Sequence, residues 1–231
     1  MHYVLGDVHN NCKKLCQLLQ RISLGTRDHL YVLGDLFDRG GDDADPAGVY
    51  CKILELGKRC TALRGNHDQW LAAYIRHYAS LSRREQEACT PYMYNSFDLL
   101  RQQLSPEDME KLEAFIRSLP LHTDLELENK KYLFAHAMTS APDRWRKADY
   151  YLMGDWYTEL FTAKGIPGYI SFCGHNNTSE FSRFPGAYCD EEGTSIWHNE
   201  AGNLYMMDCG CGFPGGRLAC MCLETGERFY E

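Results

Sequence analysis

The chain has 231 residues, of which 44% are hydrophobic and 13% aromatic, and 32 acidic residues against 24 Lys and Arg give it a net charge of −8. This composition excludes collagen-like, coiled-coil and disordered chains, and the length predicts a single domain over residues 1–231. We expect no membrane partner, because no apolar run approaches the ~18 residues of a span, and no nucleic-acid partner, because that needs a basic stripe. Taken alone, the acidic balance would also argue against an anionic substrate.

The first part of the chain alternates short apolar runs with amphipathic segments. Runs at residues 3–5, 30–33 and 61–63 predict strands, and apolar residues recur at helical spacing over 15–22 and 49–56. Strands that alternate with helices predict parallel pairing through right-handed crossovers. In such a sheet the functional site is expected at the carboxyl ends of the strands.

Residues 70–119 carry a helical pattern, and Ser105-Pro106 is typical of a helix start. We interpret this stretch as a helical insert over the sheet. After it the apolar period becomes two, which predicts a hairpin of strands 121–127 and 132–135. Further strands are predicted at residues 169–173, 195–198, 204–207 and 217–223. The second half is therefore expected to form a largely antiparallel layer.

The eleven cysteines are odd in number and lie mostly in apolar segments, which predicts free thiols. The first residues have no basic flank and no long apolar run, so we expect no secretory signal and a reducing, cytoplasmic location. Two Cys-x-Cys pairs, Cys209/Cys211 and Cys220/Cys222, flank a turn and could bring four thiols together for zinc. Structural zinc sites prefer wider spacings, so buried small hydrophobes are the favoured interpretation.

Five predicted strand ends carry polar residues, at four of them beside glycine. Three of them read GDVH (6–9), GDLFDRG (34–40) and RGNHD (64–68), and His136 and His175 end two later strands. A single Asp or His at a strand end is usually a cap or turn residue. Five ends that each offer oxygen or imidazole ligands favour one shared site instead. Mixed Asp, Asn and His ligands without thiolate suit Mn, Fe or Zn.

These blocks resemble those of the calcineurin-like metallophosphoesterase superfamily, and within it the phosphoprotein phosphatase branch. The blocks of that branch run GDxHG, GDxxDRG, GNHE, HAG and GH, and here they read GDVHNN, GDLFDRG, GNHD, AHAM and GHNNT in the same order. The blocks span Asp7 to His175, and the segment from Asp208 also resembles the bacterial members. The resemblance implies an α/β fold with a sandwich of two mixed β-sheets, one parallel-centred and the other more antiparallel, flanked by helices.

Carried over residue by residue, the resemblance implies a site for two metal ions, Mn, Fe or Zn. One ion would be held by Asp7, His9 and Asp35, and the other by Asp35, Asn66, His136 and His175, with Asp35 as the bridge. A hydroxide between the ions would attack phosphorus directly. His67 would protonate the leaving oxygen, and Asp38 would orient His67. Arg39 and Asn66 would bind the phosphate of the substrate.

The chain departs from the family pattern at several positions. Asn10 and Met138 stand where the family often has glycine, and Asp68 replaces the usual Glu. A second phosphate-binding arginine often follows a Trp after the His-Ala block, but residues 152–156 contain no arginine. Arg144 and Arg146 lie upstream, and the sequence gives no reason to choose either.

The residues and the resemblance together predict a metal-dependent phosphatase that acts on phosphomonoesters such as phosphoserine or phosphothreonine, in a protein or a small phosphoester. The alternative within enzymes is a dinucleoside polyphosphate hydrolase of the diadenosine tetraphosphate type, because bacterial enzymes with that activity share these blocks. A third hypothesis is a non-catalytic binding protein that keeps the fold. The complete set of ligand positions, together with His67, Asp38 and Arg39, argues against the third.

Overall fold

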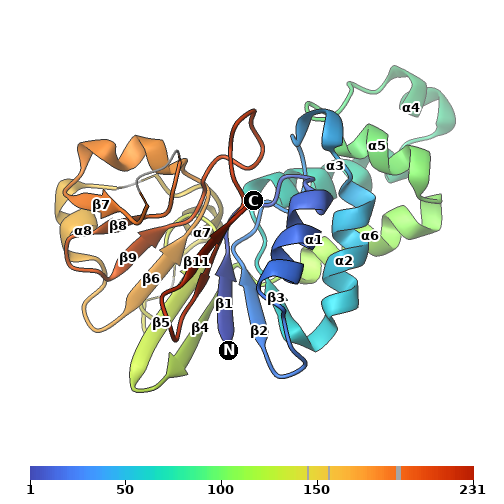
Figure 1. Ribbon diagram of the computed structural model, residues 1–231. Helices are drawn as coiled ribbons and strands as arrows, with labels where there is room; N and C mark the ends of the chain where they lie inside the picture. The colour runs from blue at the N-terminus through green and yellow to red at the C-terminus, as the bar shows by residue number, and fades with distance from the viewer. Residues whose placement is uncertain (145, 156, 191–193) are drawn as a thin grey trace.

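Two β-sheets pack face to face, and helices cover their outer faces (Figure 1). The computed structural model describes residues 1–144, 146–155, 157–190 and 194–231. The strands are β1 (His2–Leu5), β2 (His29–Val32), β3 (Cys60–Ala62), β4 (His122–Leu127), β5 (Lys130–Ala135), β6 (Ile170–Cys173), β7 (Gly186–Tyr188), β8 (Trp197–Asn199), β9 (Leu204–Met206), β10 (Ala219–Cys222) and β11 (Arg228–Tyr230). The α-helices are α1 (Cys12–Arg21), α2 (Pro46–Leu56), α3 (Asn66–Ser80), α4 (Arg83–Ala88), α5 (Ser96–Gln103), α6 (Pro106–Ser118), α7 (Ala148–Met153) and α8 (Glu159–Lys164). Short 3₁₀ helices lie at Gly41–Asp43, Gly57–Arg59 and Thr178–Arg183.

The first sheet has the strand order β11-β10-β1-β2-β3. The neighbours β1, β2 and β3 are parallel, as the alternation of strand and helix signals predicts. The end of the chain departs from expectation, because β10 pairs antiparallel with β1 and β11 with β10, so both strands join the first sheet and not the second layer. Residues 219–222 are buried throughout, which suits a strand covered on both faces.

The second sheet has the strand order β4-β5-β6-β9-β8-β7. The expectation of a largely antiparallel layer holds in part: β4–β5, β7–β8 and β8–β9 are antiparallel, whereas β5 is parallel to β6 and β6 is parallel to β9. Antiparallel pairs form at the two sides, where hairpins join β4 to β5 and β8 to β9. Turn signals identify hairpins between sequence neighbours, but the parallel pairs depend on long crossovers that leave no local signal. The second sheet is therefore parallel at its centre and antiparallel at both sides, whereas the first sheet is parallel from β1 to the edge strand β3 and antiparallel only on the side of β10 and β11.

Alternation along the strands places side chains in three apolar layers. Between the sheets, Val4 and Tyr31 of the first sheet meet Phe134 and Phe172 of the second. The opposite face of the first sheet, with Leu5 and Leu30 among others, packs under helices α1, α2, α3, α5 and α6. The predicted helical insert is thus a set of helices over the first sheet, and Ser105 caps α6 as expected. The third layer covers the outer face of the second sheet.

The cysteines are free, and the four of the two Cys-x-Cys pairs are buried. Cys209 packs in the layer between the sheets, whereas Cys211, Cys220 and Cys222 pack in the layer under the helices. Within the described ranges, none of these thiols joins a group of neighbouring metal-ligating atoms. The two apolar layers thus account for these thiols as small hydrophobic side chains.

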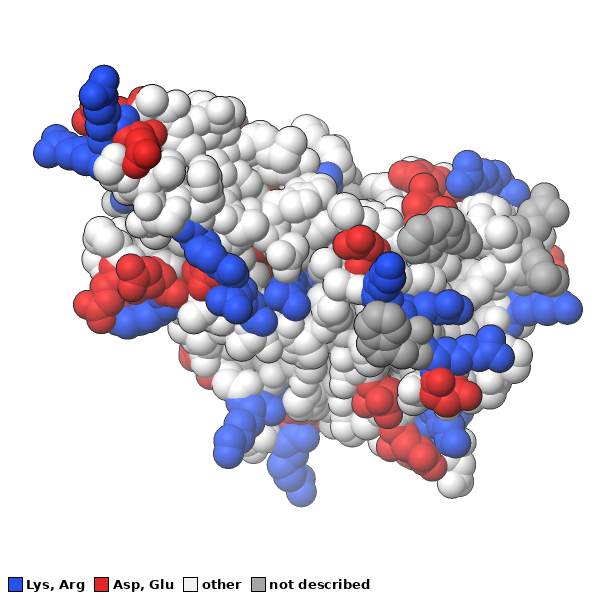
Figure 2. Space-filling model, turned by 180° about the vertical axis from the view of Figure 1, so that it is seen from behind, with Lys and Arg blue, Asp and Glu red and all other residues white. Residues whose placement is uncertain are grey.

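No helix within residues 1–144, 146–155, 157–190 or 194–231 is both long and apolar enough to cross a bilayer. On the face drawn in Figure 2, acidic side chains are interspersed among the Lys and Arg side chains. A hollow separates the helical part of the molecule from the second sheet at the upper edge of that face (Figure 2).

Candidate metal centre

The loops that follow β1, β2, β3, β5 and β6 meet at one edge of the sandwich (Figure 1). This edge is where the carboxyl ends of the parallel strands lie, as the sequence predicts. The structure gathers every predicted site residue there, and most of these side chains are buried. The buried members are Asp7, His9, Asp35, Asp38, Asn66, His67 and His136.

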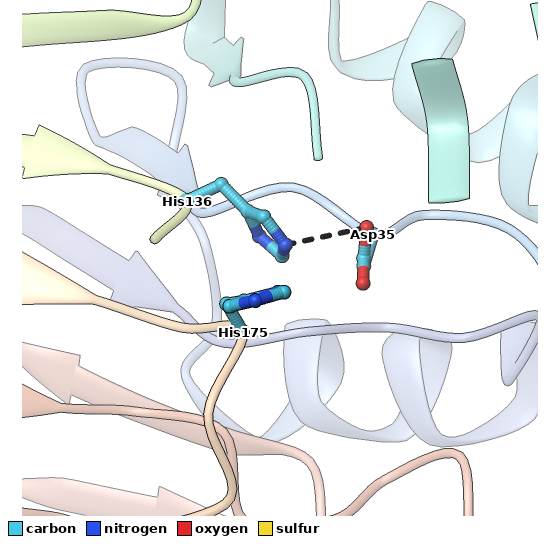
Figure 3. A group of neighbouring side chains, drawn as sticks. All are labelled: Asp35, His136 and His175. Atoms are coloured by element: carbon cyan, nitrogen blue, oxygen red, sulfur yellow. Dashed lines mark ion pairs between the residues drawn. The ribbon is translucent and has the colours of Figure 1, made fainter. Parts of the chain in front are cut away.

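Two groups of ligand atoms share Asp35. The ligand atoms of Asp35, His136 and His175 lie within 4.8 Å of one another, and the same holds for Asp7, His9 and Asp35. In Figure 3 the rings of His136 and His175 both face the carboxylate of Asp35, and the His136 Nε2 to Asp35 Oδ1 distance is 3.4 Å. One carboxylate therefore stands between two sets of donors, as a bridging ligand must.

The hydrogen bonds around His136 fit a cation at this point. Its Nδ1 donates to the carbonyl of Leu33 at 2.9 Å, so the neutral ring presents an Nε2 lone pair to the site. That nitrogen lies 2.8 Å from Asn66 Oδ1, and His175 Nδ1 lies 2.9 Å from the same oxygen. Lone pairs of nitrogen and oxygen that converge without a hydrogen repel one another, so a proton or a metal ion must lie between them.

The pKa shifts of His136, Asp35 and Asp7 also indicate that positive charge is favoured at this point. Burial alone would lower the pKa of His136, but the neighbouring Asp35 carboxylate raises it to about 10. Burial opposes ionisation of Asp35 as well, yet the charge of His136 holds its pKa well below the usual range. Burial and the charge of Asp208 raise the pKa of Asp7. Without a metal ion, protons thus supply the positive charge beside these buried carboxylates, and a metal ion would take the place of those protons.

The other donor group is organised in the same way. His9 Nδ1 donates to the carbonyl of Phe37 at 3.1 Å, which leaves Nε2 directed toward Asp35 at 3.7 Å. The Arg39 guanidinium donates to this Nε2 at 3.2 Å and supplies the positive charge there. Burial lowers the pKa of His9 to about 4, so its imidazole is neutral at pH 7. A neutral imidazole beside carboxylates fits Mn, Fe or Zn.

Glycines let the ligand loops approach one another closely. A Cβ on Gly65 would lie 2.1 Å from Asp35 Oδ1, and one on Gly174 would lie 2.0 Å from Asp7 Oδ1. Ligand residues also adopt left-handed backbone conformations themselves, with φ values of 47° at His9 and Asp35 and 64° at His175. Such strain in non-glycine residues persists only where the surroundings enforce it, and it concentrates at functional sites.

Asn10, which stands where the family often has glycine, fits its position through its backbone conformation and its side-chain hydrogen bonds. Asn10 has a φ of 61°, which asparagine tolerates better than most residues. Its side-chain amide donates to the hydroxyl of Ser96 at 2.9 Å and accepts a hydrogen bond from that hydroxyl at 3.1 Å. The amide also donates to the carbonyl of Arg39 at 3.3 Å. Asn10 therefore takes the place of glycine and adds contacts between two loops.

The shorter Asp68 also fits its position. One of its oxygens accepts from the amides of Leu36 and Phe37, and the other accepts from the amide of Gly65. These bonds join the loop after β2 to the start of α3. Burial and the nearby Asp35 charge raise the pKa of Asp68 to about 7.

His67 and Asp38 form a buried pair beside the donor groups. His67 Nδ1 lies 2.9 Å from Asp38 Oδ2, and the His67 side chain is 2% exposed. The hydroxyl of Tyr92 donates to the same Asp38 oxygen at 2.7 Å, while Asp38 Oδ1 has no hydrogen-bond partner among the described residues. A carboxylate that accepts from Nδ1 fixes the ring and leaves Nε2 to exchange a proton with a substrate.

Several residues at the site escape sequence reasoning. Tyr92 and Ser96 come from the helical insert, more than fifty positions from Asp38, and no motif marks them. Phe213 lies under the Arg39 guanidinium at 4.6 Å and is 51% exposed. An aromatic within the Gly-rich segment near the end of the chain is the one signal that could have identified it.

Arg144 and Arg146, the two arginines that precede residues 152–156, line one cavity. This cavity has a volume of about 550 Å³ and is also lined by Ser140, Tyr150 and Tyr169. Tyr169 immediately precedes β6, at the opposite end of that strand from His175. The cavity thus places both arginines beside Tyr150 and Tyr169, and neither arginine belongs to the two ligand groups. Trp156, which marks the segment of the expected second arginine, lies outside the described residues.

Comparison with known families gives a match over most of the chain. Residues 3–202 match the family described as calcineurin-like phosphoesterase. The chain is 31% identical over 137 residues to the symmetrical bis(5'-nucleosyl)-tetraphosphatase of Proteus mirabilis, a match that covers 58% of this chain and 43% of that protein. This alignment therefore spans less than half of the Proteus protein.

A second relative aligns over nearly its whole length. The symmetrical bis(5'-nucleosyl)-tetraphosphatase of a Marinomonas species is 24% identical, with 98% of this chain and 95% of that protein covered.

Solved structures show the same fold. A provisionally assigned diadenosine tetraphosphatase superposes with a TM-score of 0.64 at 19% identity, covering 100% of this chain and 92% of the other. A protein serine/threonine phosphatase from Saccharomyces cerevisiae superposes with a TM-score of 0.57 at 16% identity, covering 100% and 78%.

Proposed function

The chain belongs to the family of calcineurin-like phosphoesterases, and from this premise we propose that it hydrolyses dinucleoside polyphosphates of the diadenosine tetraphosphate type. The observation that carries the substrate class is the similarity to two symmetrical bis(5'-nucleosyl)-tetraphosphatases, one of them aligned over nearly its whole length. Sequence reasoning ranks a phosphomonoester substrate first. The similarity to these two relatives supports the dinucleoside alternative more strongly.

The proposed metal ligands are those of the two donor groups that share Asp35. One ion would be held by Asp7, His9 and Asp35, and the other by Asp35, Asn66, His136 and His175. When bound, two such ions would lower the pKa of water and so supply hydroxide near neutral pH. The buried carboxylates and neutral imidazoles suit Mn, Fe or Zn.

The remaining residues act on the substrate. Arg39 lies at the centre, with its guanidinium 3.2 Å from His9 Nε2, and would bind phosphate oxygens with this planar group. His67 donates a proton to the leaving oxygen, because Asp38 holds its Nδ1 and leaves Nε2 free to act. Tyr92 holds Asp38 in turn.

The chemistry of the leaving group separates the two enzyme hypotheses. A phosphate leaving group is stable as an anion, whereas a serine alkoxide must be protonated as it departs. Replacement of His67 by Ala should therefore reduce hydrolysis of a phosphoserine peptide more than hydrolysis of diadenosine tetraphosphate. Both rates should fall, by at least ~100-fold for the peptide.

The test is a substrate panel with the Mn²⁺-loaded protein. It compares diadenosine tetraphosphate, a phosphoserine peptide and an aryl phosphate, and it identifies the nucleotide products. We expect two molecules of ADP from each dinucleoside. Ready turnover of the peptide without turnover of the dinucleoside would favour the phosphomonoesterase, and no metal-stimulated hydrolysis at all would favour a non-catalytic protein.

A further inference from the structure

Two aromatic rings, those of Trp70 and Tyr94, flank His67, the proposed proton donor. The Trp70 ring centroid lies 5.0 Å from that of His67, and the Tyr94 centroid lies 4.5 Å from it. The rings of Trp70 and Tyr94 are parallel to within 6°, with their centroids 6.1 Å apart. Both residues are half-buried, so each is partly exposed to solvent. We refer to Trp70 and Tyr94 together as the aromatic shelf.

The fold holds this shelf in place relative to His67. Trp70 follows His67 by three positions on α3, and residues at this spacing share one face of a helix. Tyr94 lies in the segment before α5, which is tied to the loop after β2. The hydroxyl of Tyr92 donates to the Asp38 carboxylate at 2.7 Å, and the side-chain amide of Asn95 donates to the backbone carbonyl of Arg39 at 2.7 Å.

The shelf is not explained by core packing. Among the described residues, the apolar layer under the helices includes Tyr74, Tyr78 and Tyr92 at its border, but it includes neither Trp70 nor Tyr94. The aromatic residues of α3, Trp70, Tyr74 and Tyr78, therefore divide into two groups. The later two pack against the core, and Trp70 stands beside the site.

The chemistry of the shelf suits the nonpolar part of a substrate. Two parallel rings offer flat faces and no positive charge, so they do not bind phosphate. Nucleobases stack on such faces, because every base has a π-face of matching shape. His67 protonates the leaving oxygen in the proposed reaction, so a group on the neighbouring rings belongs to the leaving nucleotide.

The geometry points to the aromatic shelf as the surface on which the base of the leaving nucleotide stacks, so that Trp70 and Tyr94 determine specificity for nucleotides. This inference rests on the proposed function, since it assigns one part of the same substrate. The alternative is that the two rings only position the imidazole of His67.

Binding of products tests the shelf without turnover. Calorimetry on the Mn²⁺-loaded protein would compare ADP with pyrophosphate, which has the same diphosphate but no base. In Trp70→Leu and Tyr94→Leu we expect the Kd for ADP to rise about tenfold, while the Kd for pyrophosphate stays within about twofold. Tyr188→Leu is the control, because Tyr188 is an aromatic residue with an exposed side chain on the edge strand β7, in the second sheet.

Kinetic constants distinguish base stacking on the aromatic shelf from the alternative that the two rings only position His67. With diadenosine tetraphosphate, loss of stacking raises KM, whereas a misplaced His67 lowers kcat and leaves ADP binding intact. Equal losses for ADP and pyrophosphate, or no loss for either, would overturn the inference. If wild-type protein binds ADP through the shelf but does not cleave the dinucleoside, the proposed function fails and the shelf stands.

Fluorescence provides a second measurement should the Leu variants fold poorly. Stacking on Trp70 should make ADP quench tryptophan emission of the wild-type protein, and pyrophosphate should not. The difference should disappear in the conservative variant Trp70→Phe, which retains a ring at this position. Quenching of equal size in wild type and Trp70→Phe would contradict the inference.

Discussion

Asn10 shows how a single side chain can replace a glycine at a crowded turn. It accepts the left-handed conformation, and its amide binds Ser96 and the carbonyl of Arg39. Asn10→Ala should therefore destabilise the protein by ~1–3 kcal/mol, because it combines backbone strain with lost buried hydrogen bonds. Urea unfolding measures this loss. Asn10→Gly relieves the backbone strain and should cost less, so equal losses in both variants would argue against the role of φ.

Asp38 permits a prediction about catalysis apart from metal binding. Its carboxylate holds His67 but belongs to neither donor group. Asp38→Asn should lower kcat by ~10- to 100-fold, because the ring loses its orientation, while two metal ions still bind per chain. Tyr92→Phe removes only the hydroxyl that holds Asp38 and should have a smaller effect. Rate assays together with metal analysis test this, and metal loss in Asp38→Asn would contradict it.

At this scale, the sequence predicts which residues come together where polar side chains directly follow strands. Asp7, Asp35 and His136 occur in blocks whose spacing brings them to one edge of a sheet. Tyr92 and Phe213 escaped because their contacts depend on how distant loops fold over the site. Nothing in a local pattern encodes such contacts.

The loops that link strands to ligands depend on small residues, and Gly174 isolates this dependence. No positive φ applies there, so Ala suits the backbone, yet its Cβ would lie 2.0 Å from Asp7 Oδ1. Gly174→Ala should therefore lower metal occupancy at the Asp7 group while secondary structure is retained. Metal analysis and circular dichroism test this. Gly25→Ala is the control, because its nearest contact is a surface carboxylate at 3.1 Å.

The strands themselves show which elements a sequence predicts. Hairpins such as β4–β5 have a local signal, here a turn in which Glu128 and Asn129 both have positive φ. The parallel pair β6–β9 and the return of β10 to the first sheet have no local signal, because partners distant in sequence form them. The element types were therefore predicted better than their order in the sheets.

The net charge of −8 is a sum over the whole chain, whereas binding of a substrate depends on the charges near the site. Buried carboxylates concentrate negative charge at the metal centre, and two divalent ions would reverse its sign beside Arg39. An acidic protein can therefore bind a polyphosphate at this edge, provided that metal is present.

The same electrostatics links stability to metal and pH. His136 is buried with a pKa raised to about 10 by Asp35, so the folded protein holds a proton that the unfolded chain releases near pH 6.5. The stability from this proton is complete below about pH 6.5 and is lost as the pH rises toward 10, by at most ~1.4 kcal/mol per pH unit. With Mn²⁺ bound to its Nε2, His136 carries no such proton, and this contribution to the pH dependence should vanish.

Urea unfolding between pH 6.5 and 9.5, with chelator or with excess Mn²⁺, measures the two slopes. The chelated protein should lose stability with rising pH faster than the Mn²⁺-loaded protein. Excess Mn²⁺ should also raise stability by ~2.7 kcal/mol at 100 times its Kd, since only the folded chain gathers the ligands. In Asp35→Asn the two curves should converge, because the partner that raises the pKa of His136 and bridges the ions is lost. Parallel curves for the wild-type protein would show that His136 does not exchange its proton for the metal.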